Sequence, residues 1–452
     1  MLGARRDHFP AEIQKAYTGL IVLGTPIGES NYVQRETKRI ACSAIKNLEN
    51  IKLVEDPQME MLLLRCCAGA PKLNYWQRTC VPEDVAEAIS LFDNAVDEHL
   101  SRIVGVPVVG LDRLTFHLPL SFGGVGIPIA HLSAEAAFVS SVGSTWHMQP
   151  NLMVRRGFST ARNNLSSGGT VLPQLMDKSG FSVSPHTTQS KEFRQSVLMQ
   201  AMNGRIREDM RTNSHAKKEI VMKGRSCKGA SYWLTTPPSA WNKTVIEAAS
   251  FRALLKYSTG MKLFLGQKKC PDCGTVQDNY GHHALSCKVA SGAIYKHNSI
   301  VNNIFYEMKK ASIPCSKEEG DLRNNTRQRP GDIYMTDFDI YGEAFFDVSV
   351  ISICAQSHYK RASKGQLEGS KIRYDQKMAK YPELGARFKP LVIESTGGWH
   401  PFSFKTLSSI ADHIAVGTNK RSVECLNALL SKSAFCLQRH QGSMLVRRCL
   451  GL

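Results

Sequence analysis

Potential metal ligands gather in one short segment, which limits how this part of the chain can fold. Cys270-Pro-Asp-Cys273 supplies two thiols from one tight turn, and the segment ending at Cys287 adds a third thiol and two histidines. Zinc prefers four soft or borderline donors in a tetrahedron. The spacing is Cys-x2-Cys-x9-His-x3-Cys with His283, which we favour, or x8 and x4 with His282. We predict a structural zinc ion on Cys270, Cys273, His283 and Cys287, with buried thiols and unrelated histidines as the alternative.

Two carboxylates lie at or within strand-like runs further along the chain. Asp332 precedes Ile333-Tyr-Met, and Asp347 lies inside the apolar, β-rich run 344–351. A lone carboxylate is costly to bury in such a strand. A hairpin between the two runs would bring both acids to one end of a sheet. Because Mg²⁺ is held by one or two carboxylates and keeps several waters, we predict a magnesium site on Asp332 and Asp347.

A lysine pair and two further polar residues complete the candidate acidic site. Lys377 and Lys380 fall on one face of a helix predicted over 366–381. His297 comes from the preceding helix and Glu318 from its exit. A lysine here can stabilise developing charge or orient a water nucleophile. Considered one at a time, these residues are more simply a turn aspartate and surface charges, and only the ordered set favours a site.

The motifs from Cys270 to Trp399 resemble the C-terminal part of non-LTR retrotransposon polyproteins with a restriction-enzyme-like endonuclease of the PD-(D/E)XK class. The matching elements, in order, are the zinc knuckle, Arg329-Pro-Gly-Asp332, Phe346-Asp-Val-Ser-Val350, Lys377-Met-Ala-Lys-Tyr381 and Gly397-Gly-Trp399. The resemblance implies that Asp332, Asp347 and Lys377 form the active site, with Lys380 as the nearby alternate. Upstream, Leu23-Gly-Thr-Pro-Ile-Gly28 is similar to the end of a reverse-transcriptase palm, and the helices to about 150 are similar to its thumb.

Two features depart from this family. Gly331 is inserted between Pro330 and Asp332, where the family has Pro-Asp directly, and this insertion could displace the carboxylate. No Asp-Asp pair of the polymerase type occurs, so we expect no polymerase activity from this chain by itself. These departures indicate a truncated element or a remnant reading frame, whose polymerase-bearing partner would be a separate, unknown protein.

Length and pattern predict an α+β multidomain protein. A chain of 452 residues exceeds one ordinary core. The resemblance implies a palm remnant and thumb-like helical domain over 1–155, and composition predicts a flexible linker over 156–190 and a basic helical linker domain over 191–266. A zinc knuckle over 267–290 and a nuclease domain with an α/β core over 291–452 follow. The clearest helix is 82–104, with proline in its first turn and apolar residues at helical spacing.

The charge of +18 is spread along the chain and favours a polyanionic partner, because neutralised phosphates release counterions. The charge alone does not distinguish DNA from RNA, and basic proteins also bind membranes or acidic proteins. Together with the nuclease motifs it leads us to expect DNA and RNA as partners, and no membrane association. Nothing resembles a secretory signal, and the 13 cysteines are odd in number, which indicates a reducing intracellular compartment. For a protein that acts on DNA, we expect that compartment to be the nucleus.

These observations predict a metal-dependent endonuclease that nicks target DNA. The rival interpretation is a nucleic-acid-binding protein that keeps the zinc site and the basic surface but lacks catalysis, with Gly331 as its best support. A third is a decayed fragment with no selected activity.

Overall fold

The computed structural model describes residues 18–67, 73–145, 194–287, 289, 292–317 and 330–451. The linker predicted over 156–190 and Glu318 lie outside these described residues. The chain forms two compact units, the first from 1–50, 68–97 and 128–205, and the second from 51–67, 98–127 and 206–452. Both helices and strands are present, so the predicted α+β class is confirmed.

The first unit is mainly helical. An antiparallel hairpin of β1 (Gly19–Val22) and β2 (Thr25–Gly28) precedes the helices. The helices that contribute to this unit are α1 (Ser30–Lys52), α3 (Asn74–Gln77), α4 (Pro82–Val104), α6 (Ala130–Thr145) and α9 (Gln195–Asn213). The buried Asp93 on α4 accepts hydrogen bonds from the backbone N–H groups of Ala130 and His131, at 2.8 and 2.9 Å. It therefore satisfies two of the free donors at the start of α6.

Short helices and a buried arginine organise the first part of the second unit. The helices are α2 (Pro57–Cys66), α5 (Gly110–His117), the 3₁₀ turn η3 (Leu120–Phe122), α10 (Ala216–Arg225), α11 (Tyr232–Thr235) and α12 (Ala248–Thr259). Arg225 donates to the carbonyl oxygens of Gly124 and Ser258, at 2.8 Å each. Burial lowers the pKa of this guanidinium to about 9. Because Gly124 and Ser258 are far apart in sequence, Arg225 links three segments of the unit.

A four-stranded sheet forms the framework of the C-terminal part. The strands β3 (Cys315–Lys317), β4 (Ile333–Asp339), β5 (Gly342–Ile351) and β6 (Phe388–Glu394) lie in that order across the sheet. The first three are antiparallel neighbours, whereas β6 runs parallel to β5. A parallel neighbour requires a crossover, which α15 (Gln356–Ala362), α16 (Glu368–Lys380) and the 3₁₀ turn η5 (Pro382–Arg387) provide.

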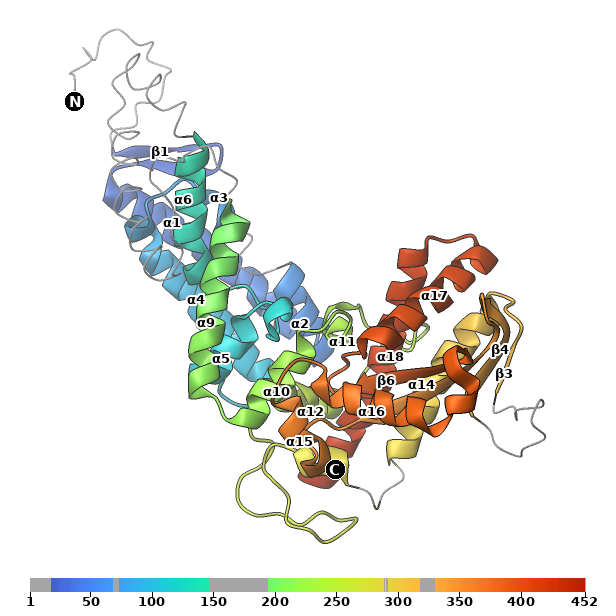
Figure 1. Ribbon diagram of the computed structural model, residues 1–452. Helices are drawn as coiled ribbons and strands as arrows, with labels where there is room; N and C mark the ends of the chain where they lie inside the picture. The colour runs from blue at the N-terminus through green and yellow to red at the C-terminus, as the bar shows by residue number, and fades with distance from the viewer. Residues whose placement is uncertain are drawn as a thin grey trace, which may run out of the picture. The chain divides into compact units, whose positions relative to one another are not determined.

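The two faces of this sheet have different coverings. One face packs on α14 (Gly292–Lys310), α17 (Pro401–Thr418) and α18 (Ser422–Leu445) through a large apolar core that includes Phe346 and Val348. The other face carries Phe345, which clusters with residues of α16 and η5. Figure 1 shows α16 beside β6. Because side chains alternate along a strand, Asp347 and Ser349 share the α16 face with Phe345.

The sequence predicted several of these elements, and the differences have local causes. The helix over 82–104 is confirmed. The apolar spacing over 248–265 predicts one amphipathic helix. In the structure this helix, α12, ends at Thr259, because Gly260 adopts a left-handed conformation with φ of 73° and closes it. None of the helices in the described part of the chain combines the length and the apolar character that a bilayer span requires.

Glu394, at the end of β6, should make the stability of this unit depend on pH. Burial raises the pKa of its carboxyl from 4.5 to about 7. Between these values the folded state binds more protons than the unfolded state, so stability falls as pH rises from 4.5 to 7. The Glu394→Gln variant should therefore be more stable than wild type at pH 8, by on the order of 3 kcal/mol. At pH 4.5 and below the two proteins should converge. Urea titrations at pH 4.5, 6 and 8 measure this, and a constant difference would contradict it.

Candidate metal centre and acidic site

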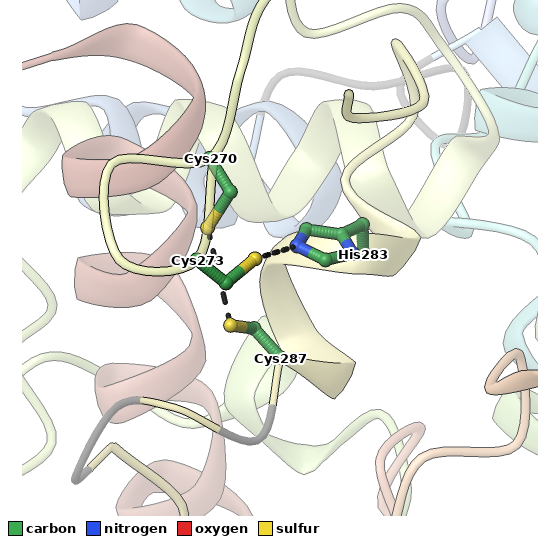
Figure 2. Close-up of side chains that lie close together, drawn as sticks. All are labelled: Cys270, Cys273, His283 and Cys287. Carbon is green, nitrogen blue, oxygen red and sulfur yellow. Dashed lines mark hydrogen bonds between the residues drawn. The ribbon is translucent and has the colours of Figure 1, made fainter. Parts of the chain in front are cut away.

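The Cys/His cluster is assembled in the structure as a compact group of donors. The Sγ atoms of Cys270, Cys273 and Cys287 and the Nε2 atom of His283 converge, as Figure 2 shows. All four ligand atoms lie within 4.8 Å of one another. Cys273 Sγ is 3.2 Å from His283 Nε2, and Cys270 Sγ is 3.9 Å from Cys287 Sγ. This donor set fits a tetrahedral zinc ion with no position left for a substrate.

The turn between Cys270 and Cys273 is closed by backbone hydrogen bonds. Cys270 N–H donates to the carbonyl oxygen of Thr275 at 2.8 Å, and Gly274 N–H donates back to that of Cys270 at 2.9 Å. Gly274 has a φ of 71°, which favours glycine. Hydrogen bonds from Thr275 lower the pKa of the Cys273 thiol to about 6, whereas burial raises the pKa of Cys287. A bound zinc ion deprotonates such thiols outright.

The structure distinguishes the two adjacent histidines. Both lie on the short helix α13 (His282–Ser286), whose first N–H groups are capped by the Asp278 carboxylate. His283 points into the cluster (Figure 2). His282 is buried elsewhere, with its ring 5.6 Å from that of Tyr257 and 6.1 Å from that of Tyr280. The structure therefore places His283, and not His282, with the three thiols, in agreement with the Cys-x2-Cys-x9-His-x3-Cys spacing that we favoured.

The C-terminal segment packs on the cluster through residues that no local motif marks. A π-helical turn, η6 (Val446–Leu450), follows α18. Asp272, within the Cys-x2-Cys turn, accepts hydrogen bonds from Arg447 at 2.8 Å and from Arg448 at 2.6 Å. Arg448 also donates to the carbonyl oxygen of Ala284 on α13. These contacts join residues 164 to 176 positions apart in the sequence, and no local sequence pattern signals them.

The two predicted carboxylates lie on neighbouring strands at one end of the sheet. Ile333 pairs with Phe346 across β4 and β5, and continuing this register by one residue sets Asp332 opposite Asp347. Asp332 N–H donates to the carbonyl oxygen of Phe346 at 2.8 Å. Asp332 Oδ2 in turn accepts from the N–H of Val348 at 2.7 Å. The Asp332 carboxylate thus takes the place of a backbone carbonyl as acceptor at the end of the β4–β5 hydrogen-bond pattern. This bond fixes the position of the Asp332 side chain beside β5.

Each carboxylate has a cationic neighbour. Lys377 Nζ, from α16, lies 2.5 Å from Asp347 Oδ2, and both side chains are mostly buried. His297 Nε2, from α14, lies 3.0 Å from Asp332 Oδ2. This hydrogen bond to Asp332 raises the pKa of His297 to about 9. Burial, together with the charge of Asp332, raises the pKa of Asp347, against the opposing effect of Lys377.

The remaining predicted residues have different outcomes. Lys380 is exposed, and its Nζ lies 4.7 Å from the centre of the Tyr381 ring, so Lys377 is the lysine that pairs with Asp347. Glu318 lies outside the described residues. Arg373, one helical turn before Lys377, donates to Ser349 Oγ at 2.9 Å and was not predicted. The i, i+4 spacing of Arg373 and Lys377 on one helix could have indicated that Arg373 lies on the same face as Lys377.

Gly331, whose insertion distinguishes this chain from the family pattern, packs tightly against β5. A Cβ atom at this position would lie 3.0 Å from the carbonyl oxygen and 3.1 Å from the nitrogen of Phe346. The absence of a side chain therefore lets the chain pass close to β5 just before Asp332. The inserted residue does not carry the Asp332 side chain away from the sheet, since Asp332 still contacts Val348.

No protein-family model matches the sequence, and no curated protein is significantly similar to it. The interpretation of both sites therefore depends on their geometry and donor chemistry.

The Cys/His cluster should carry one zinc ion per chain. Cys273→Ser should lower bound zinc and thermal stability, because structural zinc contributes folding free energy directly. Cys449→Ala is the matched control: its buried thiol lies 3.7 Å from Gln277 Oε1, outside the cluster. Metal analysis of the purified proteins and melting with and without a chelator measure this. Full zinc content in Cys273→Ser would exclude the predicted ligand set.

Gly331→Ala should destabilise the protein by about 1–3 kcal/mol, because the added methyl group would overpack against the backbone of β5. Gly204→Ala, in helix α9, is the comparison: no atom lies within 4 Å of its added Cβ. That variant should be neutral or more stable by about 0.5–1 kcal/mol, as expected for alanine within a helix. Chemical denaturation measures the free energy of unfolding of both variants. Equal changes in the two variants would show that Gly331 is not tightly packed against β5.

Proposed function

We propose that the acidic site on the C-terminal sheet hydrolyses phosphodiester bonds in DNA, as a Mg²⁺-dependent endonuclease that nicks its target. One observation carries this proposal: Asp332 and Asp347 are cross-strand neighbours, and Lys377 lies 2.5 Å from the second of them. Two acids and an amine from three separate elements thus meet at one end of a sheet. The resemblance to PD-(D/E)XK nucleases assigns these same three residues to the active site.

The donor chemistry of the site is compatible with magnesium. Mg²⁺ is usually held by one or two carboxylates and retains several waters and substrate oxygens. Asp332 and Asp347 would hold the ion, whose charge would favour the ionised form of Asp347 beyond the effect of Lys377. When bound, the ion would supply a Lewis acid that polarises the phosphate and acidifies water.

The residues of the chain would perform the remaining tasks. The Lys377 ammonium would stabilise negative charge that develops on the phosphate oxygens, or orient the attacking water. His297 would keep the Asp332 carboxylate oriented through their 3.0 Å contact. The formal charge of +18 would attract the polyanionic substrate and raise its local concentration. The zinc ion would be structural, since protein atoms fill all four positions.

DNA and RNA remain the proposed partners, and the nucleus the proposed location, because a nicking enzyme must reach genomic DNA.

A second function is favoured by a specific observation. Lys377 and His297 already neutralise the two carboxylates, so the site balances its charges without a metal ion. A protein that binds nucleic acid and has an inactive nuclease fold would retain such ion pairs for stability. Salt-sensitive DNA binding without any metal-dependent cleavage would decide for this alternative.

Nicking of supercoiled plasmid DNA tests the proposal. With Mg²⁺ or Mn²⁺ the wild-type protein should produce open circles, and Asp347→Asn or Asp332→Asn should abolish the activity. Lys377→Met should lower the rate by about 10²–10³, as loss of one charge-stabilising donor does.

Another Asp–Lys pair in the same sheet supplies the matched controls. Asp339 Oδ2 and Lys389 Nζ lie 2.7 Å apart. Asp339→Asn and Lys389→Met should retain nicking. Activity that survives in Asp347→Asn, or that is lost equally in Asp339→Asn, would refute the assignment.

A further inference from the structure

A cavity of about 600 Å³ lies within the second unit, away from the acidic site of the sheet. Its walls come from the α5 region, from the α9–α10 junction, from the end of α12 and from the loop that leads to α13. A volume of this size is within the range of about 300–1,000 Å³ that small-molecule sites occupy. The zinc cluster, the acidic pair and their partners do not line it.

Apolar and aromatic side chains form much of the lining. The apolar ones include Leu111, Met261, Leu263 and Phe264. The rings of His215 and Tyr280 lie 4.6 Å apart between their centres, at 42° to each other. His215 Nδ1 accepts a hydrogen bond from the N–H of Lys218 at 3.1 Å and caps α10, which holds the imidazole in place. Fixed rings of this kind offer a stacking surface for a flat heterocycle.

Three lysines give the cavity a net positive charge. Lys218 is buried and paired with Asp112, with Nζ 2.8 Å from Oδ1. Lys256 is partly buried and Lys262 is exposed, and no carboxylate of the described residues forms an ion pair with either. A partly buried ammonium without a counter-charge is costly, so an anion placed between Lys256 and Lys262 would be stabilised.

A further polar atom in the lining lacks a partner. Ser214 Oγ is buried and forms no hydrogen bond within the described part of the chain. Buried hydroxyl groups are nearly always hydrogen-bonded, to the protein, to water or to a ligand. The atom itself has less than 1 Å² of accessible surface, so it is an unsatisfied hydroxyl beside the cavity and not a group that a bound ligand contacts directly.

We propose that this cavity binds a nucleotide, with the base against the rings of Tyr280 and His215 and the phosphate between Lys256 and Lys262. The ligand is recognised through a flat heterocycle and one phosphate group, which a free nucleotide and one unit of a single strand both present. The site is separate from the proposed nuclease site and does not depend on cleavage.

The experiment uses the full-length zinc-loaded protein carrying Asp347→Asn, without added divalent cations, so that the outcome is independent of nicking. The two probes are 2-aminopurine riboside monophosphate and a short oligothymidylate with one internal 2-aminopurine. Stacking should quench the fluorescence of the base on binding. Quenching of both probes indicates a free-nucleotide site, and quenching of the oligonucleotide alone indicates a single-strand site.

Lys262→Glu should weaken binding of the quenched probe by about tenfold, which corresponds to one charge-assisted hydrogen bond. Lys269→Glu is the matched control, because Lys269 is also exposed on the segment between α12 and the zinc cluster but does not line the cavity. It should change the affinity by less than about twofold. Lys256→Gln, which removes the positive charge without introducing a negative one, should also weaken binding.

Three results would overturn the proposal. These are no quenching of either probe, equal weakening by Lys262→Glu and Lys269→Glu, and equal competition by a polyglutamate peptide at the same charge concentration. The last two would show general attraction of anions rather than recognition of a nucleotide.

Discussion

Two like charges face each other across an antiparallel strand pair, and the C-terminal part of the structure is arranged to tolerate them. Asp332 and Asp347 would repel each other if both were ionised without compensation. Lys377 approaches one from α16, and His297 approaches the other from α14. The two helices come from opposite sides of the sheet, so the charge balance requires the complete fold. A segment that lost either helix would leave one of these partly buried carboxylates without its cationic partner.

The zinc cluster depends on a similar convergence of distant segments. Its ligands are close in sequence, but the turn that bears two of them is tied to the end of the chain through Asp272 and Arg448. Arg448 is buried and reaches α13 as well. A structural zinc ion would therefore stabilise not only the short segment around it but also the docking of η6. Zinc content and the stability of the C-terminal part should be coupled for this reason.

Aromatic residues form a continuous set of contacts between the zinc cluster and the cavity lined by Tyr280 and His215. Tyr280 lines the cavity, packs against His215 and also lies near His282, whose neighbour His283 belongs to the zinc cluster. The cap provided by Asp278 fixes the start of α13 and thereby both histidines. A rigid support of this kind is what a stacking site needs, because a mobile ring would lose conformational entropy when a base binds.

The sequence by itself determined the features that depend on local spacing. The Cys-x2-Cys turn, the helix over 82–104, the strand around Asp347 and the lysine-bearing helix all follow from residue type and periodicity, which act over a few positions. Tertiary structure alone decided which side chains meet. It settled the choice of His283 over His282 and of Lys377 over Lys380, which spacing and resemblance only favoured, and it brought His297, Arg373 and Arg448 to their partners. These pairings depend on strand register and on helix packing between segments far apart in the chain. The local spacing of residues predicts neither.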